Sequence, residues 1–119
     1  MQLTEHIALY LTGHGLPCAV SAALPAEPDE AIAVIAAELR PAADSRGSRF
    51  QVLVRSKPGE DSALSLSSRV MEMLVGFCGL LDPESPLILR TSLEGGAAKT
   101  DMDPRGRITY SLNFRIWHI

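Results

Sequence analysis

Few residues of this chain have the types and spacing that catalysis requires. The sequence contains no Gly-x-x-x-x-Gly-Lys-Ser/Thr phosphate loop, no Gly-x-Ser-x-Gly elbow, no His-Glu-x-x-His and no Cys-x-x-Cys. A nucleophilic cysteine would need a histidine base, and no residue order favours such a pair. The residues available for it are Cys18, Cys78, His6, His14 and His118. We therefore predict that the protein is not an enzyme.

Residue types that bind metals are present, but without a ligand spacing. His6 and His14 are not spaced i, i+4, so one helix could not direct both imidazoles to the same metal ion. Glu94, Asp101 and Asp103 could together hold a hard cation, yet their spacing is not that of a calcium-binding loop. We expect a solvated acidic segment and no metal site.

Length and charge restrict the class of protein. The 119 residues suit a single domain, 1–119, with a core large enough to need no disulfide or metal. The formal net charge of -3 argues against a surface that holds nucleic-acid phosphates, because such surfaces concentrate Lys and Arg. The basic residues between positions 46 and 57 are interpreted as a solvated strand and its approach.

The sequence also predicts the compartment. No run approaches the ~20 apolar residues that a membrane-spanning helix needs, and the N-terminus lacks the pattern of a signal peptide. We expect a cytosolic protein with no membrane partner. In a reducing compartment, Cys18 and Cys78 are expected to be small buried hydrophobic residues rather than a disulfide.

Residues 108–116 are the clearest strand, because apolar and polar residues alternate there without a break. One face is expected to be buried and the other solvated. The buried face comprises Ile108, Tyr110, Leu112, Phe114 and Ile116, and the solvated face comprises Thr109, Ser111, Asn113 and Arg115.

The remaining elements follow from periodicity and from Pro and Gly breaks. We predict a helix over 2–13, an extended segment over 18–24, a strand over 49–56 and a strand over 87–93. A longer helix is expected to be capped by Asp61 or Ser62 and to carry apolar residues as far as Phe77. Residues 30–40 are ambiguous: their alanines favour a helix, whereas the β-branched centre at 32–35 favours a buried strand.

Residues 94–107 form the candidate contact segment. Between two strands, about fourteen residues are far more than the roughly two to five of most hairpin loops. The run 95–98 has no bulk to pack, so we expect a flexible loop that becomes ordered against a partner. The candidate contact residues are Glu94, Gly95, Gly96, Lys99, Asp101, Asp103, Arg105 and Arg107.

Taken together, the element order and several short motifs resemble the tail-terminator, or minor capsid, proteins of long-tailed bacteriophages. In that family a Pro-Asp-Glu loop precedes an apolar β segment, as at 28–34 here, and a strand like 51–57 follows. A helix ending like Leu74-Val75-Gly76 comes next. The family also shows an Asp-x-x-Gly-Arg turn before an alternating strand, which matches Asp103, Gly106 and Arg107.

The resemblance implies an α+β fold: a mostly antiparallel, four- to five-stranded sheet with two helices packed on one face, in the order α-β-β-β-α-β-β. It implies that 31–39 is a strand paired with 49–56. It further implies a structural virion protein that forms a homo-oligomeric ring, usually hexameric. The ring caps the tail tube, ends tail polymerisation and meets the head connector.

Such proteins bind no cofactor, and the genome DNA passes through the ring without sequence-specific binding. The location implied is the tail or neck of the virion, after assembly in the bacterial host cytoplasm. Two alternatives remain open. One is another neck component, such as a head-completion or head-tail joining protein, and the other is a cytosolic ligand-binding α+β domain.

Overall fold

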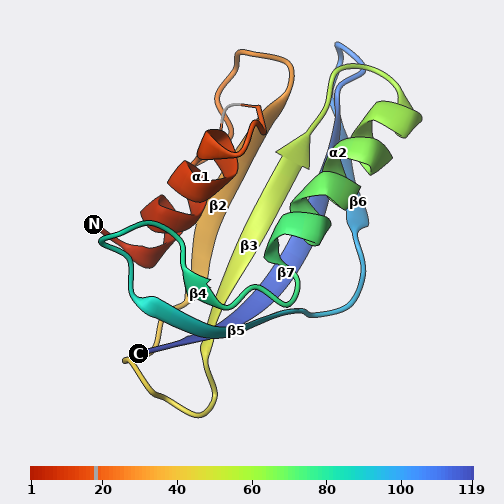
Figure 1. Cartoon of the computed structure of the whole chain (residues 1–119). Coiled ribbons are helices and arrows are strands. Elements are labelled where there is room, and N and C mark those ends of the chain that lie inside the picture. Colours follow the sequence, from red (N-terminus) through yellow and green to blue (C-terminus); the bar gives the residue numbers. More distant parts are fainter. Residues whose placement is uncertain (18) are drawn as a thin grey trace.

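The computed structural model describes residues 1–17 and 19–119. Its elements follow the chain from α1 at the N-terminus to β7 at the C-terminus (Figure 1). They are α1 (Leu3–Gly13), β1 (Ala19–Val20), β2 (Ala31–Glu38), β3 (Ser48–Arg55), α2 (Glu60–Leu74), β4 (Gly79–Leu80), β5 (Leu87–Leu93), β6 (Ala98–Met102) and β7 (Ile108–His118). No helix in the described ranges is long and apolar enough to cross a bilayer.

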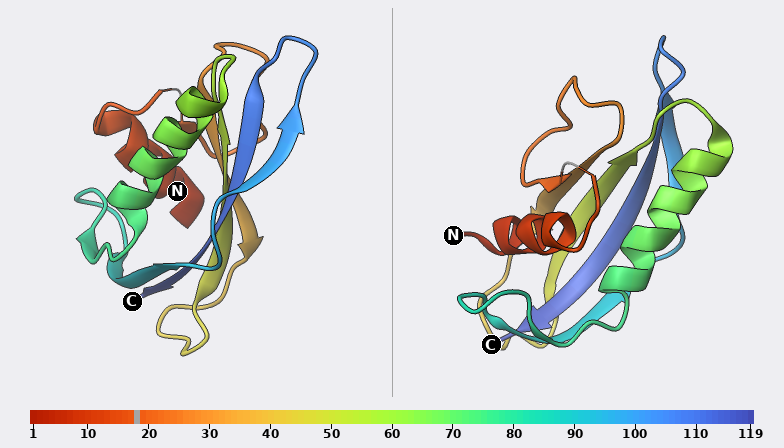
Figure 2. Two further views of the ribbon diagram at one scale, coloured as in Figure 1. Left: turned by 90° about the vertical axis from the view of Figure 1, so that its right-hand side faces the viewer. Right: turned by 45° about the horizontal axis from the view of Figure 1, so that its top comes forward.

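All seven strands join one sheet, in the order β1-β2-β3-β7-β5-β4, with β6 paired to β7. Within the described ranges, β1 and β2 are the one pair of strands that run parallel, and every other pairing is antiparallel. β3 occupies one edge of β7. On the other edge, β6 pairs with the first part of β7 and β5 with the last part. The β6–β7 hairpin therefore projects at one end of the sheet, and β5 and β4 curl round the other end (Figure 2).

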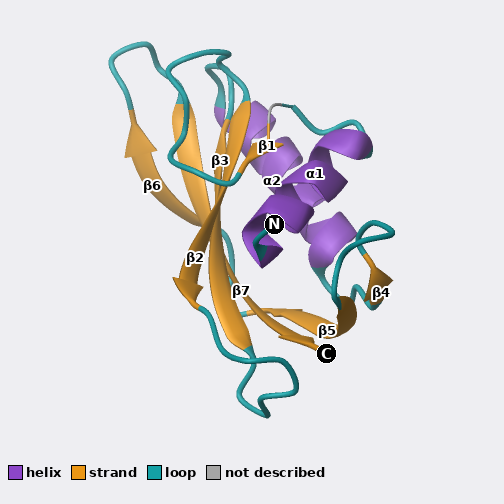
Figure 3. Ribbon diagram, turned by 90° about the vertical axis from the view of Figure 1, so that its left-hand side faces the viewer, coloured by secondary structure: helices purple, strands orange, loops and turns teal. Residues whose placement is uncertain are grey.

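Both helices lie on the same face of the curled sheet (Figures 2 and 3). α1 buries Ile7 and Leu11, and α2 buries side chains one helical turn apart, at Leu66, Val70 and Leu74. Burying each large aliphatic side chain contributes roughly 1.5–3 kcal/mol. The predicted α+β architecture with two helices on one face is confirmed.

The strand register shows how the sheet divides into an inner, helix-covered face and an outer, bare face. Val34 pairs with Val52, and Val52 pairs with Leu112, so these three buried side chains share the inner face. On the same face Phe50 and Phe114 stack with ring centroids 5.2 Å apart. The core therefore lies between the inner face and the two helices.

The strand interpretation of the ambiguous segment is confirmed, since 31–38 is β2. Its first four residues, through Val34, are all buried, and Ala31 and Ala33 point to the bare face. Alanine's helix preference is worth less than about 1 kcal/mol per residue, so pairing with β3 and core packing by the β-branched residues override it.

Several predictions on the sheet were wrong. The sheet has seven strands rather than four or five, because β4 and β6 are additional to the predicted order. The predicted flexible loop at 94–107 contains β6. Of the segment predicted to be extended at 18–24, residues 19–24 are described, and among these the strand is Ala19–Val20. On the outer face, Thr109 and Ser111 are buried rather than solvated, partly because Gln51 on β3 donates a hydrogen bond to the Ser111 hydroxyl.

Corrections also concern the long helix and the cysteines. α2 begins at Glu60 after Gly59, so neither Asp61 nor Ser62 caps it, and it ends at Leu74, before Phe77. Cys78 follows the helix in the connection before β4, where it is exposed, and is not a core residue. Cys18 lies outside the described residues.

Gly47 tests how tightly the β2–β3 loop packs on the end of β7. A Cβ there would meet the Ile116 carbonyl oxygen at 2.9 Å and the Trp117 ring at 3.0 Å, at a φ of +70°. Gly95 has a similar φ of +79° with no atom within 4 Å. Left-handed backbone costs either alanine roughly 1–2 kcal/mol, and the close contacts cost Gly47→Ala about 1–3 kcal/mol more.

Urea unfolding of both variants checks this prediction. Gly47→Ala is expected to lower the free energy of unfolding clearly more than Gly95→Ala does. Equal losses in the two variants would show that the loop does not pack against β7 in this way.

Candidate interaction site at the tip of the β6–β7 hairpin

Asp103 holds the turn between β6 and β7. Its Oδ1 accepts hydrogen bonds of 3.0 Å from the backbone N–H groups of Arg105 and Arg107, as an aspartate at the start of a turn can. Its carbonyl oxygen accepts from the Gly106 N–H at 2.9 Å, and Gly106 has a φ of +79°, which favours glycine. The Asp-x-x-Gly-Arg motif is thus the hairpin turn itself.

Arg107 joins this turn to the loop before β2. Its guanidinium donates to Asp103 Oδ2 at 2.7 Å and to the Ala26 carbonyl oxygen at 2.7 Å, and lies 3.5 Å from Asp29 Oδ1. The side chain is only 10% exposed. A charged group at this depth must have its donors satisfied, so Arg107 is a structural anchor between segments far apart in the sequence.

A second arginine, Arg55, binds the same loop through its backbone. Arg55, at the end of β3, is buried and donates to the backbone carbonyl oxygens of Pro28 at 2.6 Å and Asp29 at 2.9 Å. These carbonyls fix the path of the loop that carries the Pro-Asp-Glu motif. The two sequence motifs that resemble the phage family therefore meet in space at this end of the sheet.

Arg105 makes the exposed part of the contact. Its guanidinium donates to Glu27 Oε1 at 2.6 Å and to Asp29 Oδ1 at 3.1 Å. The side chains of Arg105 and Glu27 are 53% and 64% exposed. We call Glu27, Asp29, Arg55, Asp103, Arg105 and Arg107 the apical cluster. It contains three arginines and three carboxylates, and Arg105 and Glu27 are its most exposed members.

The electrostatics of the apical cluster favour the charged forms of Glu27, Asp103 and Arg105, whereas those around Arg55 disfavour its charged form. The hydrogen bond from Arg105 lowers the pKa of Glu27 below its ordinary value, and the same contact raises the pKa of Arg105. Desolvation alone would raise the pKa of Asp103, but hydrogen bonds from Arg107 outweigh it and lower that pKa. Desolvation, followed by the nearby charge of Arg107, lowers the pKa of Arg55.

The structure brings together only three of the eight predicted contact residues, namely Asp103, Arg105 and Arg107. On β6, Lys99 Nζ lies 3.4 Å from Glu60 Oε2 on α2, and Asp101 is exposed. At the far end of the connection, Glu94 accepts from Arg49 at 3.0 Å and from Arg115 at 3.3 Å. A Cβ added at Gly95 or at Gly96, which follow Glu94, would meet no atom within 4 Å.

Sequence reasoning missed Glu27, Asp29 and Arg55 as members of the site. The available signal was their charge next to the motifs, since Glu27 and Asp29 flank Pro28 and Arg55 ends a predicted strand. Nothing in a single sequence says that positions 27 and 105 are neighbours. That information lies in the register of β2, β3 and β7.

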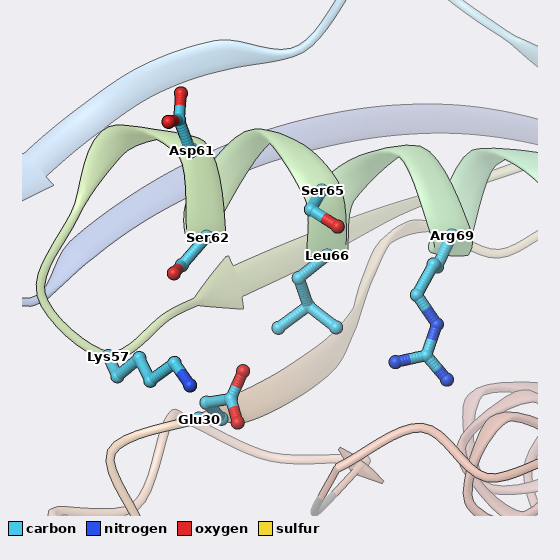
Figure 4. A pocket seen from close by; sticks show the side chains of 7 residues that line it. All are labelled: Glu30, Lys57, Asp61, Ser62, Ser65, Leu66 and Arg69. Carbon is cyan, nitrogen blue, oxygen red and sulfur yellow. The ribbon is translucent and has the colours of Figure 1, made fainter.

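A polar groove lies beside the apical cluster, between α2 and the start of β2 (Figure 4). Its volume is about 300 Å³, and Lys57 and Glu30 extend toward each other across it. The lining residues are Glu30, Lys57, Asp61, Ser62, Ser65, Leu66 and Arg69. Leu66 is the one large apolar residue among them, whereas small-molecule sites are mostly apolar and enclosed. The groove therefore gives little support to a ligand-binding function.

No group of three or more His, Cys, Asp or Glu side chains in the described part of the chain is arranged to hold a metal ion. The arrangement offers paired charges and exposed backbone rather than a reactive group.

Arg107 and Arg105 are a matched pair for testing which contacts hold the apex. Arg107→Gln removes a buried guanidinium and leaves Asp103 and the Ala26 carbonyl without their donor, so we expect a loss of about 2–4 kcal/mol in the free energy of unfolding. Arg105→Gln removes an exposed ion pair and should change stability much less. Urea unfolding measures both, and equal effects would contradict the assignment of Arg107 as the anchor.

The lowered pKa of Asp103 predicts how stability depends on pH. At pH values between the folded and unfolded pKa of Asp103, the unfolded state binds more protons than the folded state. The stabilisation of the fold by the Asp103 carboxylate is therefore complete above the ordinary pKa of 3.8 and is lost as pH falls through the folded pKa. The stability gap between the wild type and Asp103→Asn should therefore narrow as pH falls below that value. Urea unfolding at several pH values checks this, and a gap independent of pH would contradict it.

Comparison with known proteins gives one informative result. No family model matches this chain, and no curated protein sequence matches it. Among solved structures, it is similar to a chain described as "Virion of native gene transfer agent (GTA) particle", with a TM-score of 0.59 and 18% sequence identity. The similarity covers 93% of this chain and 84% of that chain. At this identity, the finding is that the two chains share a fold.

Proposed function

We propose that this protein is a structural component of a virion: a tail-terminator subunit that assembles into a ring of six copies and caps the tail tube. The observation that carries the proposal is the fold shared with a chain of a gene transfer agent virion, over 93% of the present chain. The family motifs add support, because 28–30 and 103–107 form one contact through Arg105 and Arg107.

The apical cluster is suited to contact the tube or the connector. It lies at the end of the strands, where the β6–β7 hairpin projects beyond the helices (Figure 2). Its ion pairs hold the tip in one conformation, so a partner would not have to order it, and ordering groups on binding reduces affinity. The exposed pair of Arg105 and Glu27 supplies charges of both signs for specificity.

The charge balance agrees with a channel for DNA. A ring through which a genome passes must not hold phosphates, and a subunit with a formal net charge of -3 has no excess of cations to do so. The protein would act by assembly and not by catalysis, in the tail or neck of the particle.

A different neck component is the second candidate, because the neighbour's description names a virion without stating which part. A head-completion or head-tail joining protein would bind the connector and leave free tail tubes uncapped. The two candidates therefore differ in the assembly to which the purified protein attaches.

The direct test mixes the purified protein with tubes of its particle's tail tube protein, and separately with connectors. We expect electron micrographs to show a ring at the end of each tube, and tube growth to stop. A protein that binds connectors alone would support the second candidate, and one that binds neither would overturn both.

Reversing the charge of Arg105 tests whether the apical cluster is the surface that contacts the tail tube. Arg105→Glu places a carboxylate against Glu27 and Asp29, and we expect it to reduce capping at least about tenfold. Arg46→Glu is the matched control, because Arg46 is also an exposed arginine paired with a carboxylate, Asp44, but lies in the β2–β3 loop. If Arg105→Glu caps tubes as well as Arg46→Glu does, the apical cluster is not the contact.

A further inference from the structure

The outer edge of β2 lacks a strand partner over most of its length. β1 covers it only at Ile32 and Ala33, and no other described strand pairs with that edge from Val34 to Glu38. This stretch reads Val-Ile-Ala-Ala-Glu, with Ala36 and Ala37 exposed. The edge carries no charge from Val34 to Ala37, and the register with β3 shifts only after Ala36, before the charged Glu38. An exposed, uncharged strand edge is a template for pairing with another strand unless something covers it.

The outer edge of β6 is equally free. β6 pairs with β7 on one side, and no described strand lies on its other side. All five of its residues are exposed, including Met102, which is 60% exposed. The backbone donors and acceptors along this edge are available to a partner strand.

The two free edges lie on opposite sides of the sheet and run in opposite directions. From one side to the other, the strands are β2, β3, β7 and β6, and each neighbouring pair is antiparallel. β6 therefore runs opposite to β2. A rotation about an axis along the strands preserves these directions, so β6 of one copy meets β2 of the next copy in antiparallel pairing.

We propose that the occupant of each free edge is a second copy of this chain, with β6 of one subunit adding to the 34–38 edge of β2 in the next. The contact joins different surfaces of the two copies, which is the type that closes into rings. This inference rests on the proposed function, since it names the subunit contact of the ring.

The offset along the strand direction between β6 and the free edge of β2 agrees with closure of the joined sheets into a ring. The middle of β6 falls at a register shift next to Lys99, which is level with Tyr110, and Tyr110 is level with Val54 and Ile32. The middle of the free β2 edge, Ala36, is four residues further along, or about 13 Å at about 3.3 Å per residue. Across four strand spacings of about 4.8 Å, this stagger corresponds to a strand tilt of roughly 35°, the tilt found in closed β-barrels.

The same geometry yields a channel of useful width. Six copies would contribute about 24 strands, and at this spacing and tilt the wall would be about 45 Å across from backbone to backbone. Side chains narrow this opening but leave room for a DNA duplex. With the helices outside, the bare face of the sheet, including Gln51, Ser111 and Asn113, would line the channel.

Disulfide trapping between two preparations tests the pairing. In a background in which Cys18 and Cys78 are serine, one preparation carries Ala36→Cys, and three others each carry one of Ala98→Cys, Thr100→Cys and Met102→Cys on β6. All four positions are exposed, so the domain should fold. Mixed assemblies on tail tubes are then oxidised, and covalent dimers are measured on non-reducing gels.

We expect dimers in at least one of the three mixtures and in none of the four preparations alone. Ala36→Cys mixed with Leu64→Cys, at an exposed position on α2, is the control and should give none. Rings on tubes without dimers in any of the three mixtures would overturn the edge pairing and leave the proposed function standing. Dimers from Ala36→Cys alone would also overturn it, because β2 would then pair with itself. If the cysteine-free parent caps no tubes, the proposed function fails and the edge pairing fails with it.

Discussion

The antiparallel ladder between β3 and β7 is the interaction on which the other parts of this protein depend. It runs from Ser48 opposite Ile116 to Arg55 opposite Thr109, and it places Phe50 against Phe114 in the middle of the core. A slip of one residue would turn every inner side chain to the bare face. β2 continues the ladder on one side, and β5 and β6 share the other edge of β7, so both the core and the free edges follow from this register.

The sequence predicted the elements whose own residues carry a pattern. β7 was found because apolar and polar residues alternate through Phe114, and β3 was found for the same reason around Val52. β6 could not be found in this way: Ala-Lys-Thr-Asp-Met has no apolar alternation and no buried residue, and it is a strand because β7 offers it an unpaired edge. Burial of Thr109 and Ser111 likewise depends on neighbouring side chains such as Gln51 and not on their own polarity.

In the candidate site, too, some residues could be predicted from local sequence and others only from the fold. Asp103, Arg105 and Arg107 were predicted as contact residues because they lie in a long connection rich in turn residues. Their partners Glu27 and Asp29 lie more than seventy positions away, and only the fold brings them together. The site also differs in kind from the prediction: the segment is a hairpin that the buried Arg107 anchors to the loop before β2, rather than a loop that becomes ordered on binding. Its exposed members are therefore presented in a fixed arrangement.

The proposed role as a ring-forming virion component links these features through two surfaces of the subunit. The apical cluster lies at the ends of the strands, where it can meet an assembly stacked on the ring. The free edges of β2 and β6 lie at the sides, where they can meet neighbouring copies. Electron cryomicroscopy of tail tubes capped by this protein tests the account most directly. The account predicts a closed ring with β6 of each subunit beside β2 of the next and the hairpin tips toward the tube or the connector. Monomers bound separately, or tubes without the protein, would contradict it.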